Sequence, residues 1–421
     1  MIAQVIVDVA AKQTDRVFEY HIPRELTDVA VGSRVVVPFG RRKVQGFVVG
    51  ISETTSYTGK LKDLLVVIDE LPPLTPELIA LSKTLADKIF SYRITILQSM
   101  LPRVMKANYR KILVPLTDEI KENTLFKGEP LDLNEVSDLE TIVKIKNLIK
   151  NNQAKIEYLV ENKAKKKQVA AYLLTKTRTE YQDILGGIRT TAKNQRALLN
   201  NIVEKYNEYP KLGSTIESEL GISSSTLRAA EKKGWLLKKE QEIYRNPLKD
   251  FESNASKHSV RLNSEQLDAL NSIGTSIKEK EAKTFLLEGI TGSGKTEVYL
   301  HAISTALEQK RNALMLVPEI SLTPQMIKQV KERFGDNVAV LHSGLSEGEK
   351  YDEWRRIRRA EAQVVVGARS AIFAPLKNIG LIVIDEEHES SYKQNDTPRY
   401  HARDVALLRS KFHNCPVVLG S

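Results

Sequence analysis

One segment, TFLLEGITGSGKT at residues 284–296, constrains the fold of this chain more than any other. Its apolar first part is typical of a short buried strand, and EVYLHAISTALEQ after it has the pattern of a helix. The sequence between them is G-x-x-x-x-G-K-[ST], in the strand–loop–helix context that a phosphate-binding loop requires. Glycines let the backbone wrap a phosphate, so that N–H groups and the helix N-terminus face the anion. The segment therefore predicts binding of a nucleoside triphosphate through Gly289, Ile290, Thr291, Gly292, Ser293, Gly294, Lys295 and Thr296.

A second apolar run, GLIVI, ends in DEEH at residues 385–388 and supplies the other half of this predicted site. A carboxylate at the C-terminal end of a parallel strand faces the crevice where ligands bind in open α/β sheets. We expect Asp385 to hold Mg²⁺ and Glu386 to orient or deprotonate the attacking water. In the loop, Lys295 is expected to reach the β- and γ-phosphates, and the Thr296 hydroxyl to ligate Mg²⁺.

From residue 262 onward, short apolar runs alternate with amphipathic segments. This alternation is typical of a doubly wound parallel α/β sheet, so we predict a RecA-like P-loop domain over residues 262–421. Gln266 precedes the phosphate-binding loop, and its amide, which both donates and accepts hydrogen bonds, makes it a candidate reader of adenine. Arg369 follows an apolar run, where it is placed to touch a nucleic-acid backbone.

Residues 1–108 predict a β-rich domain, because four runs of Val, Ile, Phe and Tyr are separated by turn residues. The third and fourth runs form a predicted hairpin with the tip FGRRK, which suits phosphate contact but is also common on proteins that bind no nucleic acid. Residues 74–102 then have the pattern of a helix, begun by the capping signal TPE. We predict a small β-barrel with a helical appendage.

Residues 109–248 have a mostly helical pattern. Within them, two short helical segments flank the turn GIS, which is typical of a helix-turn-helix or winged-helix fold. A helix hairpin used only for packing is the alternative explanation. In the winged-helix interpretation, the helix that can face DNA opens with Ser224, Ser225, Thr226 and Arg228. Residues 249–261 are expected to be a linker.

The formal charge of +10 is distributed unevenly. Residues 1–110 carry +4, residues 111–150 carry −2, residues 151–250 carry +7 and residues 251–421 carry +1. A basic excess outside the nucleotide-binding segment is expected of a part that binds a polyanion. Solubility charge on solvated helices explains the excess in the middle region equally well.

Length and composition narrow the class of protein further. At about 100–200 residues per domain, 421 residues predict two to four domains. The single cysteine, Cys415, excludes an intrachain disulfide and a cysteine-cluster metal site. No apolar run approaches the ~20 residues that span a bilayer, and the N-terminus lacks the basic region of a signal peptide. These features predict a cytoplasmic protein with no membrane partner.

The segments SSYKQ and RYHAR, which follow DEEH, contain Tyr392, Tyr400 and Arg403. Aromatic residues interleaved with cations suit base stacking and phosphate contact together. A loop that binds no nucleic acid remains an alternative at this point.

Six motifs occur in the order GITGSGKT, LVPEISLTPQ, LHSGLS, VVVGARSAIFAP, DEEHESSYKQ and RYHARDVA. In this order and spacing they resemble the replication-restart helicases of the primosome, along the whole chain and most strongly from residue 262 onward. The resemblance implies a superfamily-two, ATP-dependent, 3′-to-5′ DNA helicase. Such a protein recognises stalled or branched forks and D-loops and promotes reloading of the replicative helicase.

The resemblance also implies roles for individual residues. In the nucleotide site these are Gln266 for adenine, Lys295 and Thr296 for phosphate and Mg²⁺, Asp385 and Glu386 for water activation, and His388 for coupling ATP to DNA. On the DNA side they are Tyr392, Tyr400 and Arg403 in a loop that senses single strands, and Phe18, Glu19, Gly40 and Lys62 in a pocket that grips a DNA 3′ end. Glu19 stands where relatives have an aspartate, which keeps the acidic role but changes its reach.

The partners implied by the resemblance are branched and single-stranded DNA, single-stranded DNA-binding protein and helicase-loader proteins. The implied cofactors are ATP and Mg²⁺, and the implied location is the cytoplasm at the nucleoid. The middle region corresponds to the winged helix of this family.

The sequence departs from the family pattern where it stops, at Ser421. Relatives continue with a Ser-Ala-Thr motif, a zinc-binding cysteine-rich insertion, a second motor domain and a C-terminal domain, so zinc is expected only in that further part. The second motor domain would supply an arginine finger, worth about 10³–10⁵ in rate. We therefore expect the chain alone to bind ATP and DNA but to hydrolyse ATP poorly and not to unwind.

Two other classes of function compete with the helicase interpretation. One is a fork-binding module without turnover, which the missing second motor domain and the basic N-terminal regions favour. The other is a translocase of the restriction or chromatin-remodelling kind. The LVPEISLTPQ stretch and the β-rich domain argue against the translocase.

Overall fold

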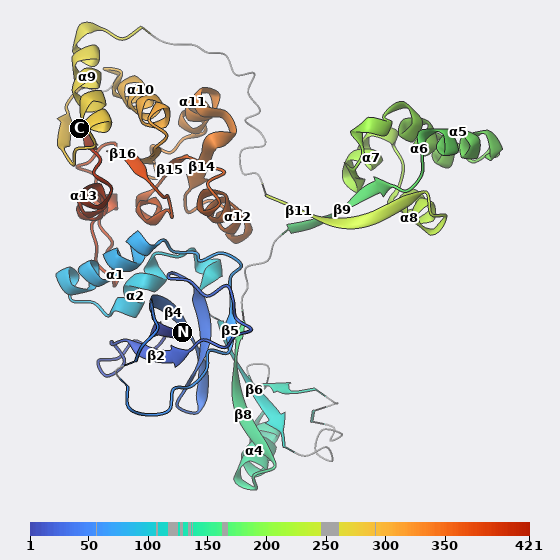
Figure 1. Cartoon of the computed structure of the whole chain (residues 1–421), viewed down its shortest axis with the longest axis horizontal. Helices are drawn as coiled ribbons and strands as arrows, with labels where there is room; N and C mark the ends of the chain where they lie inside the picture. Colours follow the sequence, from blue (N-terminus) through green and yellow to red (C-terminus); the bar gives the residue numbers. More distant parts are fainter. Residues whose placement is uncertain are drawn as a thin grey trace. The chain divides into compact units, whose positions relative to one another are not determined.

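Figure 1 shows the computed structural model of the chain, in which the described residues are 1–55, 57–106, 108–116, 125–126, 129–133, 136, 138–161, 167–245, 261–290 and 292–421. Contacts divide the chain into two units, one of residues 1–164 with 246–421 and one of residues 165–245. The predicted linker 249–261 lies outside the described residues except for Arg261. Among the described residues, no helix combines the length and apolar character needed to cross a membrane.

A six-stranded parallel sheet forms the α/β domain, as the strand–helix alternation predicts. The strands are β12 (Thr284–Leu287), β13 (Asn312–Leu316), β14 (Val338–Leu341), β15 (Val364–Gly367), β16 (Ile379–Ile384) and β17 (Val417–Gly420). The helices are α9 (Ser264–Glu279), α10 (Lys295–Glu308), α11 (Pro324–Phe334), α12 (Glu347–Arg358) and α13 (Ala402–His413). The order β12-β17-β16-β13-β15-β14 places the strand that precedes the phosphate-binding loop at one edge.

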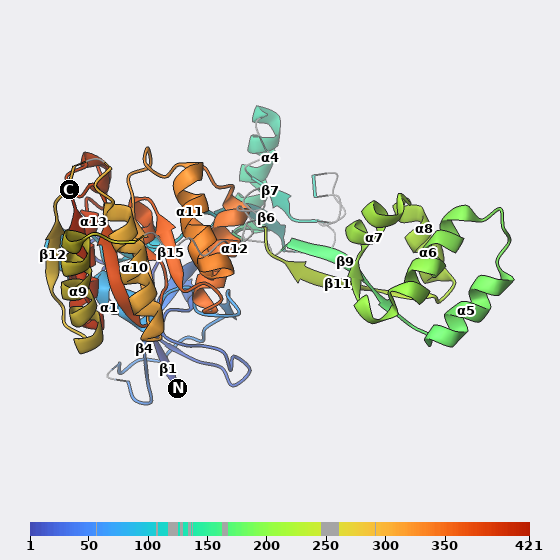
Figure 2. The ribbon, with the colours of Figure 1, turned by 90° about the horizontal axis from the view of Figure 1, so that it is seen from above.

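Helices cover both faces of this sheet. Ala313 and Met315 pack with residues of α9, α10 and α11, whereas Leu314 and Leu316 pack with residues of α12 and α13. This separation follows from the two-residue period of a strand, which turns successive side chains to opposite faces. Figure 1 shows the two helical layers, and Figure 2 looks down on the one formed by α9, α10 and α11.

The N-terminal residues form a five-stranded antiparallel sheet in the order β2-β1-β4-β3-β5. Its strands are β1 (Ile2–Val7), β2 (Phe18–His21), β3 (Arg34–Phe39), β4 (Arg42–Ser52) and β5 (Val66–Val67). The predicted strands and the β3–β4 hairpin are confirmed. The segment before β5 bonds to both β2 and β3, through Leu64 N to His21 O and Leu65 N to Val36 O, both at 2.9 Å. The sheet is therefore strongly curved, while complete closure into a barrel stays a prediction.

The single helix predicted over residues 74–102 is divided into α1 (Pro76–Ile89) and α2 (Arg93–Ser99). Thr75 caps α1 by accepting a hydrogen bond from the Leu78 N–H at 3.2 Å, as the capping signal predicts. Phe90 ends α1 in the left-handed region, with φ of 51°. This turn reverses the chain, so that α1 and α2 pack against each other.

The mainly helical pattern predicted for residues 109–248 is wrong for much of that region. The strands β6 (Asn108–Pro115) and β8 (Ala154–Glu161) pair antiparallel over their whole length, with β7 (Leu131–Asp132) at the other edge of β6 and α4 (Leu139–Lys150) before β8. These elements belong to the larger unit, so the predicted domain 109–248 is also split at residue 164. These strands are stabilised by pairing with strands distant in the sequence, and a local residue pattern does not reveal such pairing. The helical prediction failed for this reason.

The smaller unit contains the predicted helix-turn-helix. α7 (Gly213–Leu220) and α8 (Ser224–Lys232) flank Gly221, whose φ of 62° makes the turn. The other helices are α5 (Arg178–Gly187) and α6 (Lys193–Glu204), and the sheet has the order β10 (Lys211–Leu212), β9 (Lys167–Leu174), β11 (Leu236–Ile243). Ser224, Ser225, Thr226 and Arg228 lie on α8 as predicted. Their contact with DNA stays a prediction.

A buried ion pair joins the N-terminal helices to the α/β domain. The guanidinium of Arg409, on α13, donates to both carboxylate oxygens of Glu77, on α1, at 2.9 Å each. Burial acts to raise the pKa of Glu77, but the charge of Arg409, with His413 nearby, outweighs it and lowers the pKa to about 2. Beside this pair, the Trp354 indole on α12 donates to the Pro73 carbonyl at 3.1 Å. The N-terminal helices therefore share one continuous core with the sheet.

We expect Glu77→Gln to lower the free energy of unfolding by about 3–5 kcal/mol, because it leaves the Arg409 charge buried without its partner. Glu70→Gln is the matched control. Glu70 pairs with Arg359 across the same contact at 3.2 Å but is 64% exposed, so its loss should cost under about 1 kcal/mol. Fluorescence of Trp354 during denaturant unfolding, in a Trp235→Phe background that removes the other tryptophan, measures both. Equal losses in the two variants would contradict the structural role of the buried pair.

Candidate nucleotide site and DNA-end pocket

The predicted phosphate-binding loop has the expected backbone geometry. Gly292 and Gly294 have φ of 84° and 83°, and α10 begins directly afterwards at Lys295. A Cβ on Gly294 would displace the Gln266 amide nitrogen from its present place, and the positive φ itself favours glycine there. The Lys295 ammonium donates to the Gly289 carbonyl at 2.5 Å across the loop. Of the eight predicted contacts, Thr291 lies outside the described residues.

Gln266 holds the loop from the start of α9. Its amide nitrogen donates to the Ser293 carbonyl at 2.9 Å, and its amide oxygen accepts from the Asn263 N–H at 2.9 Å. Asn263 in turn caps α9 by accepting from the Gln266 N–H at 2.8 Å. Both atoms of the Gln266 amide already have one hydrogen-bond partner, but the nitrogen can donate once more and the oxygen can accept once more. The amide could therefore still bind adenine, and that contact stays a prediction.

Asp385 lies at the end of β16 and is held from three directions. Its N–H donates to the Leu316 carbonyl of β13 at 2.9 Å. Its Oδ1 accepts from the Tyr299 hydroxyl at 3.0 Å, and its carbonyl accepts from the Tyr392 hydroxyl at 2.6 Å. Burial raises the pKa of the Asp385 carboxyl above its usual value. The predicted metal-binding carboxylate is thus fixed at the carboxyl edge of the sheet, beside the first turns of α10.

Glu386 and His388 lie next to this carboxylate. The Lys295 ammonium is 3.8 Å from Glu386 Oε1, which brings the loop lysine and the second acidic residue together. Glu386 has φ of 46°, in the left-handed region that is uncommon for a side chain of this kind. His388 Nδ1 is 3.4 Å from the Ser421 hydroxyl, and its Nε2 is 3.8 Å from Glu386 Oε2. Its predicted role in coupling ATP to DNA stays a prediction.

The donor set fits a magnesium nucleotide. Oxygen ligands are those that Mg²⁺ prefers, and Thr296 and Asp385 supply a hydroxyl and a carboxylate at the loop. The Lys295 ammonium and the N-terminus of α10 supply positive charge for phosphate oxygens.

Both tyrosines of the predicted DNA loop are buried in this structure, and the contact of the loop with DNA stays a prediction. Tyr392 and Tyr400 are only 1% and 5% exposed, so neither ring is available to stack on a base in this structure. Tyr400 packs edge-on against Phe373 at 4.9 Å between ring centroids. Arg369 donates to the carbonyls of Ser391 and Lys393, at 3.1 and 2.8 Å, and so holds this loop. Its contact with a nucleic-acid backbone stays a prediction. Aromatic residues interleaved with cations predict stacking only when the rings are exposed.

Arg403 is similarly engaged within the protein. Its guanidinium donates to Glu387 Oε2 at 2.8 Å, and its side chain is 42% exposed. The cation predicted for DNA contact is therefore paired with the third residue of DEEH. A contact with a phosphate stays a prediction, and it would compete with this carboxylate.

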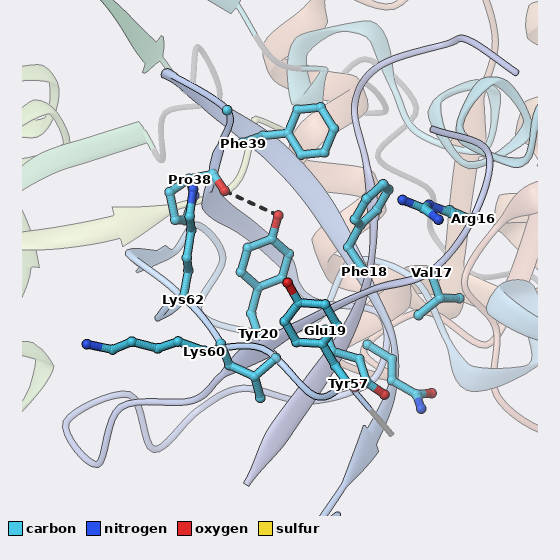
Figure 3. Close-up of a pocket in the computed structure, with 13 residues that line it drawn as sticks. Arg16, Val17, Phe18, Glu19, Tyr20, Pro38, Phe39, Tyr57, Lys60 and Lys62 are labelled. Atoms are coloured by element: carbon cyan, nitrogen blue, oxygen red, sulfur yellow. Dashed lines mark hydrogen bonds between the residues drawn. The ribbon is translucent and has the colours of Figure 1, made fainter. Parts of the chain in front are cut away.

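A pocket in the N-terminal sheet brings together the four residues predicted for a DNA 3′ end. Phe18, Glu19, Gly40 and Lys62 all line a cavity of about 690 Å³ (Figure 3). The Phe18 and Phe39 rings meet edge-on at 5.2 Å, and Arg16 lies 5.0 Å from the Phe18 ring. Phe39, from the predicted hairpin tip, also lines the pocket. Sequence reasoning missed three further lining residues, although their aromatic and basic types are those that bind nucleic acids; these are Arg16, Tyr57 and Lys60.

The β3–β4 hairpin and β2 set the walls of this pocket. The Tyr20 hydroxyl donates to the Pro38 carbonyl at 3.3 Å, which links β2 to β3 of the hairpin (Figure 3). Glu19 accepts a short hydrogen bond from the Thr55 hydroxyl, which fixes the carboxylate at the rim. The pocket therefore combines aromatic rings, lysine ammonium groups and one carboxylate.

Two parts of the chain match known protein families. Residues 4–102 match the family model of the PriA 3′ DNA-binding domain, and residues 259–418 match the model of the type III restriction enzyme res subunit. The replication restart protein PriA of Bacillus subtilis (strain 168) is 43% identical over 100% of this chain and 53% of that relative. The chain is a PriA homologue. PriA of Synechocystis is 32% identical over 100% of this chain and 51% of that relative.

The chain spans about half the length of these PriA relatives. PriA of Chlamydia pneumoniae is 40% identical over 61% of this chain and 34% of that relative. Among solved structures, the UvsW helicase of bacteriophage T4 matches at 15% identity with a TM-score of 0.27, which is too low to support a structural argument. The PriA-like pocket domain and the helicase-type α/β domain thus rest on sequence similarity and on the geometry described above.

The burial of Tyr400 leads to a test of its role. We expect Tyr400→Ala to lower the free energy of unfolding by about 3–5 kcal/mol, since it removes a buried ring. Single-stranded DNA affinity, measured by fluorescence anisotropy well below the melting temperature, should stay within about twofold. Arg399→Ala, at the exposed neighbouring position, is the control and should leave the unfolding midpoint unchanged. Base stacking would instead lower the affinity by about 1–3 kcal/mol with stability retained.

Proposed function

We propose that this chain is the DNA-end-binding and ATP-binding part of a replication-restart DNA helicase, which recognises branched DNA with a free 3′ end. The observation that carries the proposal is the pocket around Phe18 and Glu19, in the same structural unit as a phosphate-binding loop followed by DEEH. The whole-chain similarity to PriA proteins supports it.

The pocket has groups for each part of a terminal nucleotide. The Phe18 ring offers a surface for stacking a base, and Lys60 and Lys62 offer ammonium groups to the phosphate that precedes it. The Glu19 carboxylate is an acceptor for a 3′-hydroxyl, and its charge repels a 3′-phosphate. The Glu19 carboxylate, with Lys60 and Lys62 beside it, would thus distinguish a 3′-hydroxyl end from a 3′-phosphate end.

The nucleotide site uses residues of α10 and of the β16 edge. Lys295 neutralises phosphate charge, and Thr296 and Asp385 hold Mg²⁺ with the nucleotide. When bound, this ion would supply positive charge to the phosphate oxygens. Glu386, 3.8 Å from the Lys295 ammonium, orients the attacking water.

Other properties of the whole protein are proposals from the similarity to PriA. They are 3′-to-5′ unwinding, action at stalled forks and D-loops, reloading of the replicative helicase, and contacts with single-stranded DNA-binding protein and helicase loaders. A cytoplasmic, nucleoid-associated location belongs with them.

A fork-binding module without turnover is the second candidate function. One observation favours it, namely that the aromatic rings, the lysines and the carboxylate that line the pocket all lie within this chain. A chimera that joins the chain to the remaining part of the Bacillus subtilis relative separates the two candidates. ATPase activity of the chimera that does not respond to single-stranded DNA would rule out the helicase.

We expect this chain to bind a branched DNA with a 3′-hydroxyl about tenfold more tightly than the same DNA with a 3′-phosphate, because the added charge meets Glu19. Glu19→Gln removes that repulsion and should reduce the difference to under about threefold. Moving the phosphate to the 5′ end is the control and should not change the affinity. Anisotropy titrations measure each of these dissociation constants, and equal affinity for both 3′ ends would remove the end-binding claim.

For the nucleotide site, Lys295→Ala should weaken binding of a fluorescent ATP analogue by at least about tenfold, since a charge-assisted hydrogen bond to phosphate is lost. Affinity for the 3′-hydroxyl DNA should stay unchanged, because the pocket lies on a different domain. Lys310→Ala, a lysine beyond the end of α10, is the matched control. Unchanged nucleotide binding in Lys295→Ala would show that the loop is not the site.

A further inference from the structure

Tyr299 is a buried tyrosine whose hydroxyl touches the predicted metal-binding carboxylate. It lies on α10, one turn beyond Lys295, and its side chain is 0% exposed. The hydroxyl donates to Asp385 Oδ1 at 3.0 Å. A phosphate-binding loop requires the lysine and the hydroxyl residue after it, and does not require tyrosine at this position.

The surrounding structure leaves space for this hydroxyl. A Cβ on Gly420, in β17, would lie 1.8 Å from the Tyr299 hydroxyl oxygen and 3.1 Å from Asp385 Oδ1. The adjacent strand therefore has glycine at the one point where a side chain would displace the hydroxyl or the carboxylate. A phenylalanine ring in the same place would not need this opening.

The hydroxyl acts on the orientation of the carboxylate. A carboxylate on a short side chain can rotate about its last bond, and that torsion is broad. A hydrogen bond to Oδ1 from a rigid, buried ring restricts the rotation and leaves Oδ2 for another ligand. Tyr392 differs, because its hydroxyl reaches the main-chain carbonyl of Asp385 and cannot select a carboxylate rotamer.

We infer that Tyr299 is a positioning residue for the magnesium nucleotide: its hydroxyl fixes Asp385 Oδ1 so that Oδ2 faces the Mg²⁺ held with Thr296. The inference rests on the proposed nucleotide site and adds to it a residue that touches neither nucleotide nor metal. It makes α10 contribute twice, through the loop residues at its start and through Tyr299 one turn later. Partners of a metal ligand that lie outside the coordination shell commonly change metal affinity by about 10–100-fold.

The test is Tyr299→Phe in the 421-residue chain, with binding of a fluorescent ATP analogue followed across a Mg²⁺ titration. We expect the Mg²⁺ concentration at half-saturation to rise about tenfold. Binding of the analogue in EDTA should stay unchanged, because the phosphate contacts of the loop remain. Tyr181→Phe is the matched control: Tyr181 is also 0% exposed and donates its hydroxyl to the Trp235 carbonyl in the other unit. It should leave the Mg²⁺ dependence unchanged.

Gly420→Ala gives a second, independent test. The added methyl group displaces the hydroxyl, so this variant should raise the Mg²⁺ requirement in the wild-type background. In the Tyr299→Phe background it should add little, because the group it displaces is already gone. This comparison keeps the inference testable if one variant folds poorly, and thermal unfolding of each variant shows whether it does.

The possible outcomes separate the inference from the proposed function. A wild-type Mg²⁺ response with an identical response in Tyr299→Phe overturns the inference alone. Equal weakening of Tyr299→Phe in Mg²⁺ and in EDTA also overturns it, since that result indicates a general packing defect. Absence of nucleotide binding in the wild-type chain overturns the proposed nucleotide site and the inference with it.

Discussion

The buried ion pair between Glu77 and Arg409 determines how the larger unit is built. Its partners are 332 positions apart in sequence, and the Arg409 side chain is completely buried. Such a pair adds little net stability compared with an apolar contact. However, separating its two side chains would leave a charge buried without a partner, so only folds that keep them together are stable. The Arg409 guanidinium also donates to the Ile372 and Ala374 carbonyls, so one side chain holds α1, α13 and the segment after β15 together. The N-terminal sheet, through Ile6 and Phe47, and the α/β sheet, through Ile382 and Ile384, therefore both contribute residues to one core.

The two predicted binding sites differ in the charge of the residues around them. The N-terminal region carries +4 and its pocket is lined by Arg16, Lys60 and Lys62, whereas residues 251–421 carry only +1. Phosphate contacts supply most of the affinity for DNA, so the N-terminal domain is better suited to hold DNA than the α/β domain is. The α/β domain instead concentrates its polar groups at one sheet edge, where they suit a nucleotide. The two predicted binding sites thus lie on separate parts of one unit and differ in their surrounding charge.

Local patterns predicted those elements that local forces determine. The phosphate-binding loop, the strands of the N-terminal sheet, the Thr75 cap and the turn at Gly221 each depend on residues within a few positions of one another. The four pocket residues came from the family resemblance, and the structure brings them together. Contacts between distant segments escaped prediction: the ladder of β6 with β8, the partner of Arg409, and the burial of Tyr392 and Tyr400. Burial depends on what packs above a side chain, and neither residue type nor spacing contains that information.

Asp385 shows why the aromatic loop and the nucleotide site form one physical system. Its carbonyl accepts from the Tyr392 hydroxyl at 2.6 Å, while its carboxylate accepts from the Tyr299 hydroxyl. Exposing the Tyr392 ring for a base would remove it from the core and break the bond to that carbonyl. A state in which this loop stacks on DNA therefore differs from the present structure at the metal-binding residue itself. Because Arg369 holds the Ser391 and Lys393 carbonyls, that change also requires the guanidinium to leave the loop. A phosphate is the kind of group that could draw it away.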